Sequence, residues 1–164
     1  MRILVSAGSK HGATAEIGRA IADVLAGQGV ETTVAAPEDV VNLDPYDGVV
    51  LGSSVYAGHW TADARDLVDR CSSQFAGRFV WLFSSGPIGD PPKPEEDPVD
   101  VAPIMETTGA RSHVVFAGKL DRKVLSFGER AIVTAFRAPE GDFRDWDEIS
   151  GWATQIAEEL KASA

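Results

Sequence analysis

The chain has 164 residues, 44% of them hydrophobic, and carries 25 acidic against 15 basic side chains, which gives a formal net charge of -10. A chain of this size buries about two-thirds of its unfolded surface as one compact unit, so we expect residues 1–164 to form a single domain. The negative charge repels phosphate backbones and anionic membrane surfaces, which argues against nucleic acid as a partner.

The first half of the chain alternates between strand and helix patterns. The aliphatic run 2–6 predicts a strand, and from Thr14 apolar residues recur at spacings of three and four, which predicts a helix that stops near Gly27. A second strand is predicted over 30–35. The run 48–54 is continuously apolar before its serines, which is typical of a central parallel strand covered by helices on both faces.

The second half continues this alternation. The sequence predicts helices over 61–71, 99–108, 125–136 and 146–160, and strands over 79–84 and 112–116. Between them, the prolines and charges of 90–98 forbid regular structure and indicate a solvated loop. Five strands alternating with helices predict a doubly wound α/β fold with right-handed crossovers, and such sheets bind ligands beyond the carboxyl ends of their strands.

The loop after the first predicted strand has the composition of a phosphate-binding loop. Ser9 and Thr14 place hydroxyls on either side of Gly12, directly before a helix whose first N–H groups are free to hold an anion. The spacing matches neither a Walker P-loop nor G-x-G-x-x-G, which disfavours nucleoside triphosphates and NAD. The alternative interpretation is a plain turn with a helix N-cap.

Two further loops are expected to open on the same edge of the sheet. After the third strand, Tyr56 and Trp60 flank Gly58, and a flat heterocycle can stack on such rings. After the fourth strand, the segment 85–89 offers backbone donors and acceptors that suit the polar edge of a flavin ring. The alternative for each aromatic ring is packing beneath its loop.

Metal-binding and membrane-spanning patterns are not found in this sequence. Cys71 is the only cysteine and the 3 histidines lie far apart, so we expect no metal site. No apolar run approaches twenty residues, and the first residues lack a signal-peptide layout. We therefore expect a cytoplasmic protein without an integral membrane segment.

Several segments together resemble the flavodoxins. The sequence Ser-Lys-His-Gly-Ala-Thr at 9–14 is similar to the flavodoxin phosphate loop, and 53–60 and 84–89 fall where flavodoxins place their two ring-binding loops. Segments 116–120 and 129–132, with Asp145-Trp146, resemble the branch that contains the bacterial menaquinone-dependent protoporphyrinogen IX dehydrogenases. The resemblance implies a flavodoxin-like, five-stranded parallel sheet of order 2-1-3-4-5 with helices on both faces, and FMN as cofactor.

The resemblance also implies a set of cofactor-binding residues. For the FMN phosphate these are Ser9, Lys10, His11, Gly12, Ala13 and Thr14; for the ring they are Ser54, Val55, Tyr56, Ala57, Gly58, His59 and Trp60 on one side and Ser85, Gly86, Pro87, Ile88 and Gly89 on the other. His11 stands where flavodoxins usually have a hydroxyl residue, which either weakens the grip on phosphate or, if the imidazole is protonated, strengthens it. No catalytic side chain is assigned, because FMN carries the redox chemistry.

Three functions remain open at this point. The branch resemblance implies an oxidoreductase that acts on an organic substrate such as a quinone or a porphyrinogen. The acidic composition is equally compatible with an electron carrier that docks basic redox partner proteins. An FMN-free interaction module on the same fold is the third. Candidate partners for the propionates of a porphyrin are Lys119, Arg122, Lys123 and Arg130. The alternative interpretation is that these residues form an ordinary solvated face.

Overall fold

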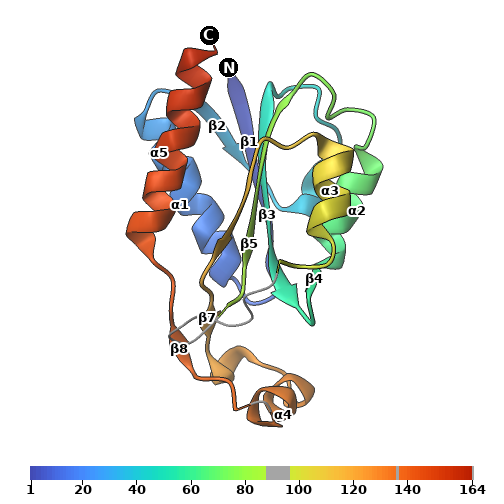
Figure 1. Ribbon diagram of the computed structural model, residues 1–164, viewed down its shortest axis with the longest axis vertical. Helices are drawn as coiled ribbons and strands as arrows, with labels where there is room; N and C mark the ends of the chain where they lie inside the picture. Colours follow the sequence, from blue (N-terminus) through green and yellow to red (C-terminus); the bar gives the residue numbers. More distant parts are fainter. Residues whose placement is uncertain (88–96, 136, 164) are drawn as a thin grey trace.

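In the computed structural model, which describes residues 1–87, 97–135 and 137–163, five parallel strands form the central sheet (Figure 1). They are β1 (Arg2–Gly8), β2 (Glu31–Val34), β3 (Gly48–Tyr56), β5 (Phe79–Ser85) and β6 (His113–Phe116). Their order is β2-β1-β3-β5-β6, so the predicted doubly wound order 2-1-3-4-5 is confirmed. A short strand that the sequence did not predict, β4 (His59–Trp60), folds back antiparallel onto the end of β3.

Helices cover both faces of the sheet, as predicted. α1 (Ala13–Gly27) and α5 (Trp146–Ala162) lie on one face, and α2 (Ala62–Arg70) and α3 (Val101–Thr108) lie on the other (Figure 1). Local capping fixes where two of them begin, since the Thr61 hydroxyl accepts the Ala64 N–H at 3.4 Å and the Asp145 carboxylate accepts the Asp147 and Glu148 N–H groups, each at 3.1 Å. Among the described helices, none is long and apolar enough to cross a lipid bilayer.

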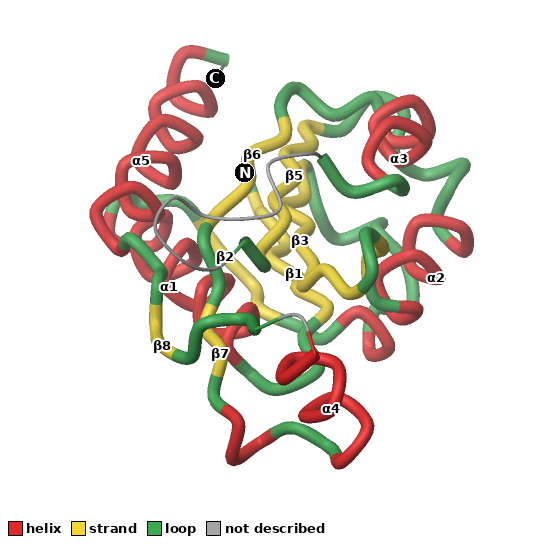
Figure 2. Tube along the Cα trace, turned by 60° about the horizontal axis from the view of Figure 1, so that its bottom comes forward, coloured by secondary structure: helices red, strands yellow, loops and turns green. Residues whose placement is uncertain are grey.

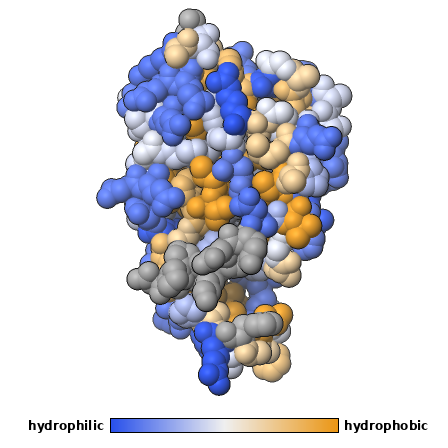
Figure 3. Space-filling model, viewed as in Figure 1, coloured by the Kyte–Doolittle hydropathy of each residue, from blue (hydrophilic) through white to orange (hydrophobic). Residues whose placement is uncertain are grey.

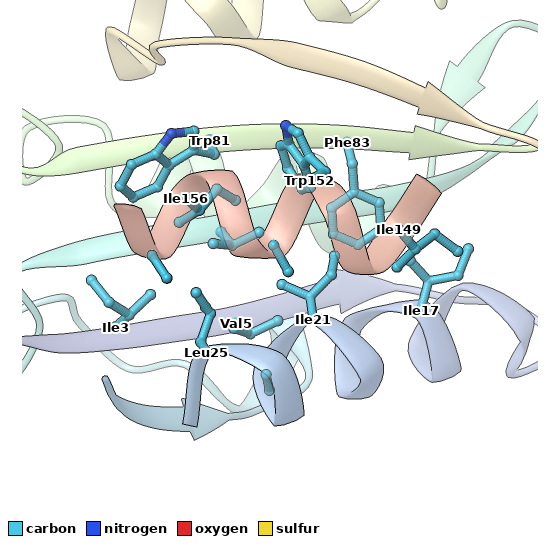
Figure 4. Close-up of a cluster of buried hydrophobic side chains, with 14 of the residues drawn as sticks. Ile3, Val5, Ile17, Ile21, Leu25, Trp81, Phe83, Ile149, Trp152 and Ile156 are labelled. Atoms are coloured by element: carbon cyan, nitrogen blue, oxygen red, sulfur yellow. The ribbon is translucent and has the colours of Figure 1, made fainter. Parts of the chain in front are cut away.

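The alternation of side chains along the strands builds one core on each face of the sheet. On the α1 and α5 face, Ile21 and Trp152 pack against Val5 and Phe83 (Figure 4). On the other face, Leu4 and its neighbours on β3 and β5 pack against the apolar side of α2 and against Val101 at the start of α3. The layers hold the carboxyl ends of β1, β3 and β5 side by side.

After β6 the chain leaves the sheet before it returns as α5. We call residues 117–145 the insert; it contains the hairpin of β7 (Lys119–Leu120) with β8 (Gly141–Asp142), the short 3-10 helix η2 (Arg122–Val124), and α4 (Phe127–Ala135). The insert lies beyond the carboxyl-end edge of the sheet and apart from both helical layers (Figures 1 and 2). The sequence predicts α4 as a helix but not its position, because α4 has no residue buried in either core.

Candidate functional site

The loops that follow β1, β3 and β5 meet at one edge of the sheet. Parallel pairing aligns Gly8 with Ser53, and Ser54 with Ser85, so β1 and β5 end one residue apart along β3, which continues to Tyr56. The Ser54 hydroxyl donates to the Gly8 carbonyl at 3.4 Å, which connects the first two strand ends directly. The ends of these three strands therefore lie side by side at one edge of the sheet, as predicted.

The loop of residues 9–12 leaves the start of α1 open. Ser9 closes the loop by accepting the Gly12 N–H on its hydroxyl at 3.0 Å. Gly12 has a φ of 93°, which a glycine adopts without strain, and a Cβ at this position would meet nothing within 4 Å. In the described part of the chain no side chain caps α1, so the N–H groups of its first turn face the space above Gly12. This is the arrangement that a phosphate requires.

Two cationic or protonatable side chains stand beside this opening, and both contact Glu129 of α4. The Lys10 ammonium lies 3.2 Å and the His11 Nε2 lies 3.0 Å from the same carboxylate oxygen, Oε2. The His11 hydrogen bond, followed by smaller contributions from Ser126 and Lys10 against an opposing burial effect, lowers the pKa of Glu129 to about 2. Glu129 is therefore ionised at neutral pH.

Tyr56 joins the same cluster from the second loop. Its ring lies 5.2 Å from the Lys10 ammonium and meets the His11 ring edge-on at 6.3 Å between centroids. Burial, reinforced by the charge of Glu129, raises the pKa of the Tyr56 hydroxyl, so it stays protonated at neutral pH. With 39% of its surface exposed, the ring remains available for a flat ligand.

The tip of the second loop is a tight turn between β3 and β4. Ala57 and Gly58 have φ values of 51° and 80°, the left-handed pair that two-residue hairpins favour. Ala57 is not a glycine, so its conformation is strained, a feature that clusters at ligand-binding loops. The Val99 N–H donates to the Gly58 carbonyl at 2.8 Å and holds the turn in place.

Trp60 does not lie where a stacking residue is expected. It is only 2% exposed, and its indole N–H donates to the Ser84 hydroxyl at 2.8 Å within the core. The backbone N–H of Trp60 and the ring of the neighbouring His59 both contact the Asp100 carboxylate, at 2.9 and 3.2 Å. Of the two alternatives that the sequence left open for Trp60, the structure therefore favours packing beneath the loop, and Tyr56 is the exposed ring of this pair.

The third loop is described only in part. Ser85 is 2% exposed at the end of β5, and the next residues, Gly86 and Pro87, run alongside the beginning of the insert. There the Gly118 N–H donates to the Pro87 carbonyl at 2.7 Å, and a Cβ on Gly118 would lie 3.0 Å from the Gly86 Cα. The remaining predicted contacts, Ile88 and Gly89, fall outside the described residues.

Behind the site, hydrogen bonds between side chains connect Trp60 of β4 with Ser84 of β5 and His113 of β6. The Ser84 hydroxyl accepts from the Trp60 indole and lies 2.8 Å from His113 Nε2, so it donates to that nitrogen when the ring is neutral. Burial lowers the pKa of His113 below its ordinary value, against a smaller opposing effect of Asp97. The folded protein thus favours the neutral ring.

This shift gives a pH dependence of stability. Since the folded pKa lies below the unfolded value of about 6.5, the contribution of His113 is fully present above pH 6.5 and is lost as the pH falls toward the folded pKa. We expect the free energy of unfolding, measured by urea titration at pH 7.5 and 5.5, to fall less in His113→Gln than in the wild type. An equal fall in both proteins would contradict this assignment.

Two surface hollows of about 370 Å³ each accompany these features. One lies on the insert and is lined by Arg122, Lys123, Arg130 and Thr134. The other is lined by residues that include Met1 and Arg78, at the opposite, amino-end edge of the strands. Ligands of doubly wound sheets bind at the carboxyl-end edge, so only the hollow on the insert lies on the functional side.

The sequence of this chain matches the model of the flavodoxin domain family over residues 4–147. The chain belongs to this family. Solved flavodoxins share its fold: one from the domain Archaea is 20% identical with a TM-score of 0.68, covering 98% of this chain and 99% of its own. Flavodoxin 2 from Bacillus cereus is 22% identical with a TM-score of 0.67, covering 97% and 99%. Among curated proteins, no sequence matches this chain significantly.

Membership of the flavodoxin domain family indicates FMN as the cofactor. The residues present fit that group. The uncapped start of α1 and the open space above Gly12 suit a phosphate, Lys10 supplies a positive charge beside it, and the half-exposed Tyr56 ring offers a surface for the isoalloxazine.

The sequence predicts the three loops as cofactor-binding segments, but it does not predict that two residues of the insert contact the first of them. Glu129 reaches His11 across 118 residues of sequence and also contacts Lys10. Arg144, just before α5, donates to the Ala13 carbonyl at 3.1 Å and pairs with Glu16 at 3.0 Å in the first turn of α1. For Glu129 the sequence signal is local, because Ser126 and Glu129 have the spacing of a helix capping box. That signal does not extend to Arg144.

Proposed function

We propose that this flavodoxin-family protein is an FMN-dependent oxidoreductase acting on an organic substrate with anionic groups, of the protoporphyrinogen or quinone dehydrogenase type. The observation that carries the proposal is the hollow on the insert, lined by Arg122, Lys123 and Arg130. It is a cationic surface on a chain with a net charge of -10, and it belongs to the segment that contacts the phosphate loop. The single cysteine, Cys71, supports a cytoplasmic location.

In this proposal the chain binds FMN and orients an organic substrate beside it. Residues 9–14 hold the phosphate, while Tyr56 and the loop residues 54–59 and 85–87 border the ring. When bound, FMN supplies the redox chemistry by taking up and releasing electrons. The guanidinium and ammonium groups of the hollow then hold the carboxylates of a porphyrinogen at the same edge of the sheet.

The exposed apolar side chains of the insert suit the other part of such a substrate. Phe127 is 91% exposed, Ile132 59% and Val124 49%. Figure 3 shows apolar and hydrophilic residues side by side at this end of the molecule. Apolar groups next to cationic ones match a molecule that has an apolar ring system and anionic substituents.

The second candidate is an electron carrier without a substrate of its own. It is supported by the acidic composition, which favours docking of basic redox partners, and by the flavodoxins among the structural neighbours. Mixing the FMN-loaded protein with protoporphyrinogen and a quinone separates the two. Oxidation above the uncatalysed rate supports the enzyme, and oxidation at the uncatalysed rate leaves the carrier. A protein that binds no FMN would instead be an interaction module.

The role of the hollow gives a sharper prediction. Lys123→Gln removes one exposed positive charge from the lining of the hollow. It should raise KM for the anionic substrate about threefold to tenfold and leave kcat nearly unchanged, because the lost contact stabilises the bound substrate and the transition state equally. The control is Lys161→Gln, the same change of charge near the end of α5. An equal effect of the two substitutions on steady-state kinetics would contradict the assignment of the hollow.

A further inference from the structure

The Glu129 carboxylate lies beside the residues that are expected to bind the flavin phosphate. Its Oε2 lies within 3.2 Å of the Lys10 ammonium and of His11 Nε2, the two nitrogen-bearing side chains of residues 9–14. The side chain of Glu129 is only 16% exposed, while that of Lys10 is 51% exposed. A carboxylate of this chain therefore already pairs with the two nitrogen-bearing side chains beside the start of α1, while the backbone N–H groups of that helix start remain for the phosphate.

The position of this carboxylate is fixed by the start of α4. Glu129 Oε1 accepts the Ser126 N–H, and the Ser126 hydroxyl accepts the Glu129 N–H, each at 3.2 Å. This reciprocal pair is a capping box, which satisfies two N–H groups at the helix start. One oxygen of Glu129 thus caps α4 while the other faces the phosphate loop, so the carboxylate cannot turn away without uncapping its own helix.

We propose that Glu129 is an internal competitor of the flavin phosphate and limits the preference of this site for phosphorylated over unphosphorylated flavin. The inference rests on the assignment of FMN to residues 9–14. A phosphate dianion and a carboxylate at the same two donors repel each other strongly in a partly buried site. FMN binding must therefore either displace the insert from the phosphate loop or proceed against this repulsion. Riboflavin, which has no phosphate, meets neither obstacle.

The test compares the affinities of FMN and riboflavin for three proteins by quenching of flavin fluorescence. Glu129→Gln removes the charge but keeps the capping box, in which glutamine serves as well as glutamate. We expect it to bind FMN about tenfold more tightly than the wild type, with riboflavin affinity unchanged. The control is Glu140→Gln, which makes the same change of charge on the insert at a half-exposed residue paired with Arg122. It should leave both affinities unchanged.

Other outcomes overturn the inference in distinguishable ways. If Glu129→Gln binds FMN as tightly as the wild type, or less tightly, the carboxylate does not compete with phosphate. If Glu140→Gln strengthens FMN binding equally, the effect is one of net charge and not of position. If the wild type binds neither flavin, the assignment of FMN fails first and the inference fails with it.

Discussion

Replacing Gly52 by alanine should lower the free energy of unfolding by about 3 kcal/mol. Gly52 lies in the middle of β3, and its cross-strand partner on β5 is Phe83. The Phe83 ring lies over the bare backbone of Gly52, so an added Cβ would overlap with the ring. The substitution therefore forces a buried aromatic side chain out of its place.

Phe83 packs its ring against two other buried aromatic rings. Its ring is 0% exposed and lies 5.9 Å from the ring of Phe116 and 6.0 Å from that of Trp152, measured between centroids. Because packed interiors have few voids, the clash is passed on to β6 and α5. The loss is measured by urea unfolding followed by circular dichroism.

A matched glycine gives the control for this substitution. Gly151 lies on the exposed side of α5, and a Cβ there would meet nothing within 4 Å. Gly151→Ala should raise the free energy of unfolding by about 0.5–1 kcal/mol, since alanine is the better helix former. If both alanine variants shift stability in the same direction, the contact between Gly52 and Phe83 does not control this part of the core.

Removing the Arg144 guanidinium is expected to loosen the insert. The side chain is 4% exposed; it pairs with Asp142 at 2.7 Å and Glu16 at 3.0 Å, and its guanidinium lies 4.6 Å from the centroid of the Trp146 ring. It therefore joins β8 to the first turn of α1. Arg144→Met should cost about 2 kcal/mol, less than for a fully buried pair because both acidic partners are partly exposed.

Hydrogen exchange identifies the segment that loses stability in Arg144→Met. Amides of residues 117–135 should exchange faster in Arg144→Met than in the wild type, while amides of β1 and β3 keep their protection. The control is Arg65→Met, since Arg65 is a half-exposed arginine 3.9 Å from Asp100 and should change stability by no more than about 0.5 kcal/mol. Unchanged exchange in the insert of the Arg144 variant would show that other contacts hold this segment.

The fold could be predicted from the sequence because its determinants are local and periodic. The continuous apolar run at 48–54 is typical of a strand that is buried on both faces. The apolar stripe of Ile149, Trp152 and Ile156 is typical of a helix that is buried on one face. The prediction of a phosphate loop at residues 9–14 likewise rests on a glycine and hydroxyls within six neighbouring residues. For the fold, secondary structure follows from short-range spacing.

The rest depends on contacts between distant segments. Trp60 follows a strand end as a stacking residue would, but the β4 hairpin turns its ring into the core toward Ser84. The capping box identifies Ser126 as a helix start, yet nothing local shows that the insert folds back so that Glu129 reaches His11. The position of Trp60 follows from the β4 hairpin and that of Glu129 from the path of residues 117–145, and no periodicity in the sequence predicts either.

The packing of α1 against α5 has a consequence for synthesis on the ribosome. One of the two cores includes residues from both helices, so it stays open until the 17 residues of α5 have left the exit tunnel. Nascent chains of this protein should therefore expose Ile17, Ile21 and Leu25 until α5 has emerged. Chaperone protection at that stage is more important for such a fold than for proteins whose early segments complete a core by themselves.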